Sequence, residues 1–291
     1  MNSLLSNHAW YELISPVTLI MAVLLCYWYF HAIIKKPHYG LTNTQKTYFF
    51  TSVSLFFLVE GTPLDVIADD YLLSALVLQV SVMAFVVVPL FILSLPAQYL
   101  SVFFWRHKRT KFAKKLFAYP WILALIFNGL VTMFLIPSFF DAIHASSLLQ
   151  FLYEVVLVTF AFLTWWIIIQ PYDEVADNSY FKRLAYVFFT ALFLMPIGIF
   201  LLAVQQTLYT SYMDVSGDLI PVLNVVYDQQ LAGALLKILQ LSSYSIALFY
   251  LLKMWGISDS EQEEQDDDKR VVQGIVIQLN ERNRKNKGRK R

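Results

Sequence analysis

The sequence contains a single cysteine and little charge. Cys26 is the only thiol among 291 residues, which excludes a disulfide within the chain and any site built from paired cysteines. Charged residues make up 15% of the sequence, whereas soluble domains contain about 25%. Hydrophobic residues make up 58%. These proportions exclude a soluble domain of ordinary composition and predict a membrane protein with several spanning segments.

The motifs of common enzymes and nucleic-acid-binding proteins are also missing. The nine glycines form no phosphate-binding loop, and no Ser-His-Asp arrangement or acid/base pair of carboxylates stands out. The lysines and arginines at the C-terminus follow an apolar chain, and such a tail is poor evidence for a nucleic-acid partner. We therefore do not expect an enzyme or a nucleic-acid-binding protein.

Long apolar runs dominate what is present. A helix of about 20 apolar residues crosses the hydrocarbon core of a bilayer. Seven runs reach this length, at residues 12–34, 47–67, 71–93, 117–138, 147–169, 184–206 and 229–254. The sequence predicts an all-α fold, a polytopic membrane protein folded as a seven-transmembrane helix bundle.

Lysines and arginines are confined to alternate connections between these runs, which sets the expected orientation. Basic residues favour the cytoplasmic side of a membrane. They cluster after the first, third, fifth and seventh runs, and the other connections carry only acidic residues such as Asp65 and Asp141. We expect an outside N-terminus and a cytoplasmic C-terminus. Lys237, about eight residues inside the last run, is the exception.

The chain changes character near residue 256. Residues 1–256 are predicted to form the seven-helix transmembrane domain. Residues 257–291 contain an acidic block, a short apolar block and a basic block. Charge blocks of this kind are typical of disordered segments. We predict that residues 257–291 form a charged, disordered cytoplasmic tail.

Four polar residues share one predicted depth. Glu60, Gln79, Glu154 and Lys237 each lie seven or eight residues from the outer end of a different run, or roughly 12 Å below the outer boundary. A lone charge in a bilayer is unfavourable, so we expect Lys237 to pair with Glu154 or Glu60. Such a cluster either only holds the bundle together or forms a site that opens to the outer side.

Two local features lie within the predicted spans. Pro89 falls inside the third run, where its ring should kink the helix or end its regular part. Trp165 and Trp166 come at the cytoplasmic end of the fifth run, which is the usual place for residues that anchor a helix at the membrane interface.

Residues that could bind a soft metal are few and scattered. Imidazoles and thioethers bind copper. His144, Met133 and Met213 lie near the predicted outer side, but no spacing typical of a ligand pair connects them. From the residues alone, these three are weak candidates for a metal site.

Several motifs resemble bacterial cytochrome c oxidase assembly factors of the CtaG (caa3-type) family. Two resemblances lie around the third run, in Thr62-Pro63-Leu64-Asp65 and in Tyr71-Leu72-Leu73-Ser74-Ala75-Leu76 with Gln79. Further along, Pro89-Leu90, Leu95-Pro96 and Trp165-Trp166 are also similar to the family pattern. The opening of the last helix, Asp228-Gln229-Gln230-Leu231-Ala232-Gly233, matches in full. The resemblance covers about residues 15 to 255 and implies the same seven-helix layout.

The sequence departs from the family pattern where a metal ligand is expected. Family members carry His after Ser-Ala, and His or Met four residues later, where this chain has Leu76 and Val80. They also tend to carry a His beside the tyrosine of the fifth span, where Glu154 follows Tyr153. The family is associated with building a copper-containing oxidase, so copper is an implied ligand. Leu76 and Val80 cannot bind it, which leaves direct copper binding open.

The resemblance implies a non-enzymatic assembly factor in the plasma membrane of a bacterium. It would assist formation of the copper-containing oxidase subunit from the outer side, in contact with an oxidase subunit or a copper chaperone. The alternatives are a transporter or channel with a buried Glu/Lys ion or proton relay, and a paralogue that acts only as a scaffold. We expect the functional face to be an outer polar cluster formed by Glu60, Asp65, Gln79, Glu154, Asp228, Gln229, Gln230 and Lys237.

Overall fold

The computed structural model describes residues 13–104, 107–172, 179–213, 219–220 and 222–288. Helices make up 84% of the chain, and the described residues contain no strand, which confirms the all-α prediction. The main helices are α3 (Pro16–Tyr29), α4 (Asn43–Glu60), α5 (Pro63–Asp70), α6 (Leu73–Val82), α7 (Val88–Leu93), α8 (Ala97–Phe104), α9 (His107–Leu116), α10 (Pro120–Phe134), α11 (Pro137–His144), α12 (Ser147–Ile169), α13 (Tyr180–Phe193), α14 (Met195–Ala203) and α15 (Val225–Gly288). Short helical turns are η1 (Phe30–Ile34), η2 (Pro37–Tyr39), η3 (Met83–Val87) and η4 (Thr210–Tyr212).

Five helices are long and apolar enough to cross a membrane without a sharp bend. They are Pro16–Ile34, Leu73–Leu93, Ser147–Ile169, Tyr180–Ala203 and Val225–Ser258. Two further helix pairs pass the same test but are bent, by 48° between α4 and α5 and by 66° between α9 and α10. The number of spans is therefore between five and seven. The predicted count of seven is reached if each bent pair crosses the membrane once.

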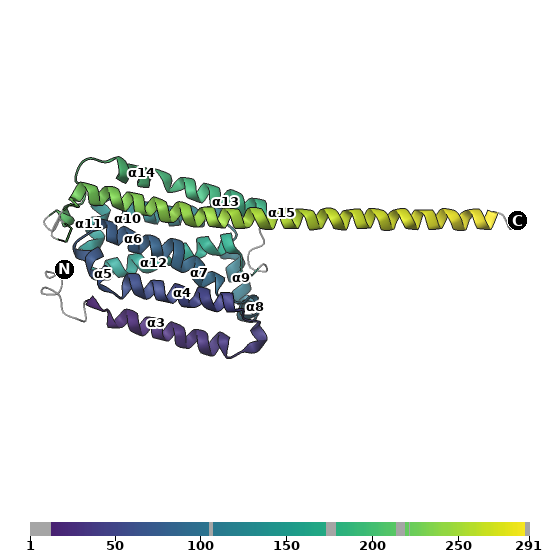
Figure 1. Cartoon of the computed structure of the whole chain (residues 1–291), viewed down its shortest axis with the longest axis horizontal. Coiled ribbons are helices and arrows are strands. Elements are labelled where there is room, and N and C mark those ends of the chain that lie inside the picture. The colour runs from purple at the N-terminus through teal and green to yellow at the C-terminus, as the bar shows by residue number, and fades with distance from the viewer. Residues whose placement is uncertain (1–12, 105–106, 173–178, 214–218, 221, 289–291) are drawn as a thin grey trace.

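The long helices lie side by side and alternate in direction along the chain (Figure 1). Connections of one kind therefore gather at the same end of the bundle. The short helices α5 and α11 lie at one end, which we call the acidic end because it carries Asp65, Asp69, Asp70 and Asp141. The helices α8 and α9 lie at the opposite, basic end, where α9 carries Lys108, Arg109, Lys111, Lys114 and Lys115.

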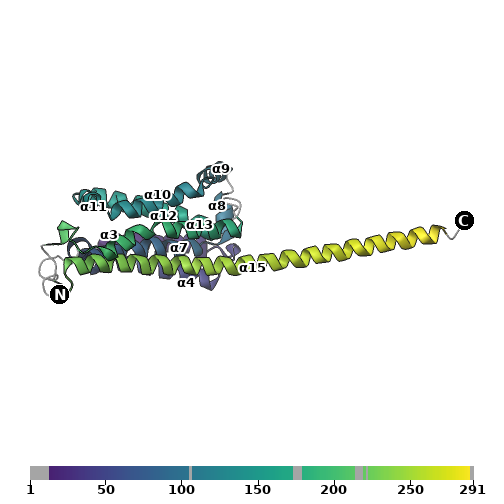
Figure 2. The ribbon, with the colours of Figure 1, turned by 90° about the horizontal axis from the view of Figure 1, so that it is seen from above.

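Helix α15 continues well past the bundle. Its membrane-length apolar part ends at Ser258, and the helix projects alone from the basic end as far as Gly288 (Figures 1 and 2). An isolated helix of charged sequence is only marginally stable in water. Disorder of residues 257–291 remains a prediction.

Pro89 neither ends the third predicted span nor breaks it. The helix from Leu73 to Leu93 stays continuous because η3 forms a wider, π-helical turn just before the proline. Side chains from two neighbouring helices bond to carbonyl groups of this turn. The Trp165 indole N–H donates to the Ala84 carbonyl over 2.9 Å, and the Ser52 hydroxyl donates to the Val87 carbonyl over 3.1 Å.

The tryptophan pair lies in the core, so the prediction that it anchors the helix at the membrane interface is wrong. Trp165 is 2% exposed and Trp166 3% exposed. The Trp165 ring packs against Tyr244 of α15, and the Trp166 ring stacks on Phe117 with ring centres 6.0 Å apart. These contacts join α12 to the last helix and to the connection between α9 and α10. Aromatic packing therefore decided the position of the pair.

Helices α14 and α15 approach each other closely because two glycines face the contact. A Cβ atom on Gly233 would lie 2.8 Å from the Leu201 Cβ atom. A Cβ atom on Gly198 would lie 2.1 Å from the Cε atom of Lys237, whose side chain passes directly over this glycine. Small residues allow this kind of close helix packing in membranes.

We predict that Gly198→Ala destabilises the protein. The added methyl group would overlap the buried Lys237 side chain, and an overpacked core typically costs about 1–3 kcal/mol. Gly129→Ala is the matched control, because a Cβ atom on Gly129 would have nothing within 4 Å in another mid-helix position. Thermal unfolding of both variants in detergent checks the prediction. Equal melting temperatures for the two variants would contradict it.

Candidate functional site

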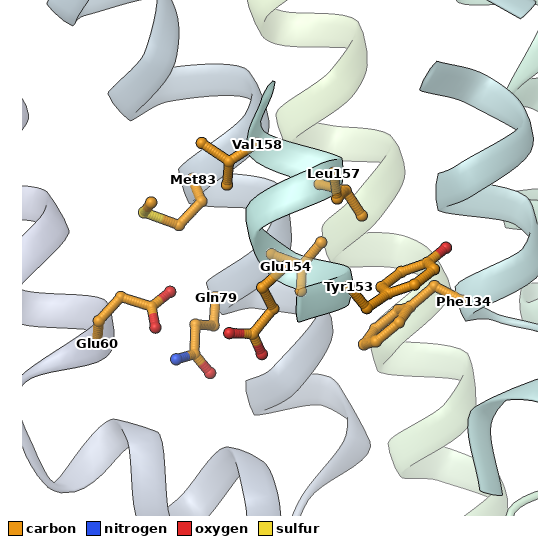
Figure 3. A pocket seen from close by; sticks show the side chains of 9 residues that line it. Glu60, Gln79, Met83, Phe134, Tyr153, Glu154, Leu157 and Val158 are labelled. Carbon is orange, nitrogen blue, oxygen red and sulfur yellow. The ribbon is translucent and has the colours of Figure 1, made fainter. Parts of the chain in front are cut away.

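A small cavity near the acidic end is lined by two carboxyl groups and one amide. Glu60 from the end of α4, Gln79 from α6 and Glu154 from α12 surround it, and we call it the carboxylate chamber. Gln79 lies between the two glutamates, which point toward it from opposite sides (Figure 3). The remaining wall is formed by Val80, Met83, Phe134, Tyr153, Leu157 and Val158. The cavity measures about 20 Å³, and roughly 10–15 Å³ is enough for one water molecule.

Asp65 fixes the orientation of the Gln79 side chain. The Gln79 Nε2 atom donates to Asp65 Oδ1 over 2.7 Å. Asp65 reaches this position because α4 ends at Glu60 and the chain bends by 48° into α5. Thr62 caps the new helix, since its hydroxyl accepts from the Leu64 N–H. With its nitrogen held by Asp65, Gln79 leaves its Oε1 atom without a hydrogen-bond partner.

A larger polar cavity lies next to the chamber at the acidic end. We call it the polar vestibule. Its volume is about 460 Å³, and it is lined by Asp69, Asp70, Phe140, Asp141, His144, Ala145, Ser147, Gln150, Ser211 and Tyr212. The Gln150 Nε2 atom donates to Asp69 Oδ1 over 2.7 Å, which holds α12 against α5. Gln150 is one helical turn before Glu154, so its side chain lies between the vestibule and the chamber.

The carboxyl groups of the two cavities interact with one another. Asp65, Asp69 and Glu154 each act on Glu60 through space, and Asp69 also acts on Glu154. No ion pair to Lys or Arg relieves this repulsion among the residues that the structure describes. The arrangement therefore attracts positive charge.

His144, at the end of α11, is the basic group nearest to these carboxylates. Its Nδ1 atom lies 3.0 Å from the Phe140 carbonyl, so Nδ1 carries the proton and Nε2 keeps a free lone pair. The ring stacks on Phe140 at 3.8 Å between ring centres. Burial lowers the pKa of His144 below its usual value, although the backbone bond and the nearby Asp69 and Asp141 act in the opposite direction. The pKa shift favours the neutral ring.

Lys237 pairs with neither Glu60 nor Glu154, so that prediction is wrong. The Lys237 ammonium donates to the Leu194 carbonyl and to Gln240 Oε1, both over 2.7 Å. Gln240 in turn donates to the Ala191 carbonyl over 2.9 Å. The break between α13 and α14 lies beside Pro196, which has no N–H and interrupts the helix bonding. The hydrogen-bond acceptors of Lys237 are therefore a backbone carbonyl at this break and the amide oxygen of Gln240, not a carboxylate.

The three polar residues that open α15 bind backbone groups. Asp228 accepts from the Leu73 N–H over 2.7 Å and from the Ser74 N–H over 3.2 Å, which caps the start of α6 from a distant part of the chain. Gln229 accepts from the Leu208 N–H and donates to the Gln206 carbonyl. Gln230 donates to the Val204 carbonyl. Asp228 and Gln229 are buried, and all three residues connect α15 to its neighbours.

The structure thus brings together four of the eight residues predicted for the polar cluster. Glu60, Asp65, Gln79 and Glu154 meet at the chamber, whereas Asp228, Gln229, Gln230 and Lys237 do not line it. The cluster predicted from the sequence did not include Gln150, although Gln150 lies four residues before Glu154 and therefore on the same face of α12. It also left out Gln240, three residues after Lys237. Met133 and Met213 line neither the chamber nor the vestibule, and only His144 of the metal candidates does.

We predict that Asp228→Ala lowers the stability of the bundle by about 1–3 kcal/mol, because two buried N–H groups would lose their acceptor. Asp141→Ala is the control, since Asp141 accepts only an exposed bond from Ser211. Its cost should stay within about 0.5 kcal/mol. Equilibrium unfolding in detergent measures both changes. A loss no larger than that of the control would contradict the capping role.

We also predict that His144 makes the protein less stable as the pH falls. Because its pKa is lowered in the folded state, the unfolded chain binds more protons near and below about pH 6.5. This contribution is fully present above that pH and is lost as the pH falls through the folded pKa. The melting temperature of the wild-type protein, relative to that of His144→Phe, should therefore fall between pH 7.5 and 5.5. A constant difference between the two proteins over this range would contradict it.

Comparison with known proteins was made at the level of families, curated proteins and solved structures. No curated protein and no solved structure matches the chain. The sequence model described as cytochrome c oxidase caa3 assembly factor (Caa3_CtaG) matches residues 25–256, which covers the bundle from the middle of α3 to the membrane-length part of α15. The chain therefore belongs to the cytochrome c oxidase caa3 assembly factor family.

Proposed function

We propose that this protein is a non-enzymatic assembly factor that helps to form the copper-containing subunit of cytochrome c oxidase. Membership of the caa3 assembly factor family supports a role in oxidase assembly. The single observation that supports the location of this role is the presence of two polar cavities at the acidic end of the bundle. Between its acidic and basic ends the bundle exposes many large hydrophobic side chains, as lipid contact requires.

The acidic end would face the outside of a bacterial plasma membrane. The segregation of lysines and arginines to the opposite end supports this orientation, because basic loops stay on the cytoplasmic side. The N-terminus would then lie outside and the C-terminus in the cytoplasm. In this orientation the vestibule opens toward the compartment in which an oxidase subunit or its copper chaperone would be met.

The described residues do not fit a copper site in the chamber. Leu76 is 1% exposed and has no donor atom, and Val80 forms part of the chamber wall. The polar groups that do line the chamber are oxygen donors, which prefer hard cations to Cu(I). Among the residues the structure describes, no three His, Cys, Asp or Glu side chains are placed to hold a metal ion. We therefore propose that the protein acts on the oxidase subunit or its chaperone through contact at the acidic end.

The partner surface that fits this end would be basic. The vestibule presents Asp69, Asp70 and Asp141, and complementary charge speeds association and fixes orientation. A transporter with a Glu/Lys relay has less support, because Lys237 is bonded at the α13–α14 break and not to the glutamates. A scaffold without a binding site has less support as well, because Gln79 keeps a buried acceptor unpaired.

The proposal predicts that deletion of the gene lowers the content and activity of cytochrome c oxidase in membranes. Wild-type protein supplied from a plasmid should restore both. The double variant Glu60→Gln with Glu154→Gln should restore them poorly while it accumulates normally, because it removes the charge of the chamber. Asp259→Asn, on the part of α15 beyond the membrane-length segment, is the control and should restore both. Normal oxidase content in the deletion strain would rule out the role.

A further inference from the structure

The carboxylate chamber contains one buried hydrogen-bond acceptor without a donor, although the amides of Gln79 and Gln150 act on Glu60 and Glu154. Glu60 and Glu154 supply carboxyl oxygens, and Gln79 presents its Oε1 atom because its nitrogen is bonded to Asp65. Gln79 is only 4% exposed, yet this oxygen has no partner. Figure 3 shows the amide between the two carboxyl groups. A buried acceptor is normally paired, so the chamber lacks a donor or a positive charge.

The elements that surround the chamber supply no cation to fill this need. From α5, Asp65 accepts a hydrogen bond from Gln79 and Asp69 lines the vestibule, and both are acidic. From α12, Gln150 donates its amide N–H to Asp69. His144 of α11 lies in the vestibule with its ring stacked on Phe140. Lys237 is bonded to Leu194 and Gln240 on another side of the bundle. The donor must therefore be a proton on one of the two carboxyl groups, or a water molecule or cation that enters from solution.

We propose that the chamber binds one small monovalent cation, of which Na⁺ is the type, in exchange with protons. The ligands are the carboxyl oxygens of Glu60 and Glu154 and the amide oxygen of Gln79. This inference goes beyond the assembly role and does not depend on it. The orphaned Gln79 oxygen supplies the third ligand of a site that otherwise has only two carboxylates.

Size and chemistry select this class of ligand. The cavity of about 20 Å³ has room for one ion or one water molecule, not for an organic cation. The oxygen donors disfavour soft metals. The two carboxyl groups and the amide offer at most five oxygens, fewer than the six to eight that Ca²⁺ takes, and Mg²⁺ usually keeps several water molecules, for which this cavity has no room.

The vestibule provides the route by which the ion enters. It is acidic, measures about 460 Å³ and lies beside the chamber, with Gln150 between Asp69 and Glu154. Carboxylates that line a cavity raise the local concentration of cations. The ion would pass Asp69 and Gln150 before it reaches Glu154. A proton bound at Glu60 or Glu154 would compete with it.

Reaction with dicyclohexylcarbodiimide tests the proposal on the full-length protein in lipid nanodiscs. This reagent adds to a protonated carboxyl group in apolar surroundings, and a carboxylate that holds a cation is protected. Labelling of Glu60 and Glu154 is measured by peptide mass spectrometry in NaCl and in choline chloride of equal ionic strength. We expect labelling in choline and a several-fold decrease in Na⁺. The Na⁺ concentration that gives half protection should rise at least tenfold in Gln79→Met, whereas Gln240→Met, which replaces another buried glutamine, should leave it unchanged.

Equal labelling in Na⁺ and choline would overturn the proposal, and so would unchanged protection in Gln79→Met. If Gln79→Met does not fold, the proposal is tested instead by the melting temperature of the wild-type protein in Na⁺ and in choline. Na⁺ should raise it relative to choline, and the absence of both a shift and protection would leave only protons and water in the chamber. These results concern the purified protein, so they are separate from the oxidase content of a deletion strain.

Discussion

Carbonyl and amide groups inside this bundle must find partners within the protein, because lipid offers none. The third and sixth predicted spans each contain a proline, and both solve the resulting problem with side chains from neighbouring helices. At Pro89 a wider turn is bonded by Trp165 and Ser52. Near Pro196 the free carbonyls are bonded by Lys237 and Gln240. This requirement is the main constraint on the structure.

The same constraint explains most buried polar residues. Asp228 replaces a missing cap at the start of α6, where Leu72 at the cap position makes no side-chain bond. Arg183 donates to the carbonyls of Ile168 and Ile169 at the end of α12. The Asp228 bonds join α15 to α6, which lie far apart in the sequence, and the Arg183 bonds join α13 to the preceding helix α12. Together they make the helix arrangement specific, which apolar contacts alone do less well in a membrane.

The chamber differs from these sites because its polar groups satisfy one another only in part. Glu60 and Glu154 meet without a described basic partner, and Gln79 keeps one acceptor unpaired. An arrangement of this kind is less favourable for the empty protein than a closed network of hydrogen bonds would be. Polar groups that remain unsatisfied in a membrane protein are typical of a functional site. This is the reason why the proposed contact with an oxidase subunit or its chaperone is placed at the acidic end.

The sequence by itself determined the all-helical fold, the approximate positions of the apolar helices and the separation of basic from acidic connections. These properties depend on local composition and on helix length, which can be read along the chain. It also identified Glu60, Gln79 and Glu154, because their depth follows from counting residues along each run. Only the tertiary structure decided which of these groups face each other. Lys237 lies at a similar depth but on another side of the bundle, since depth along a helix does not fix the direction of a side chain around it, and helix packing does.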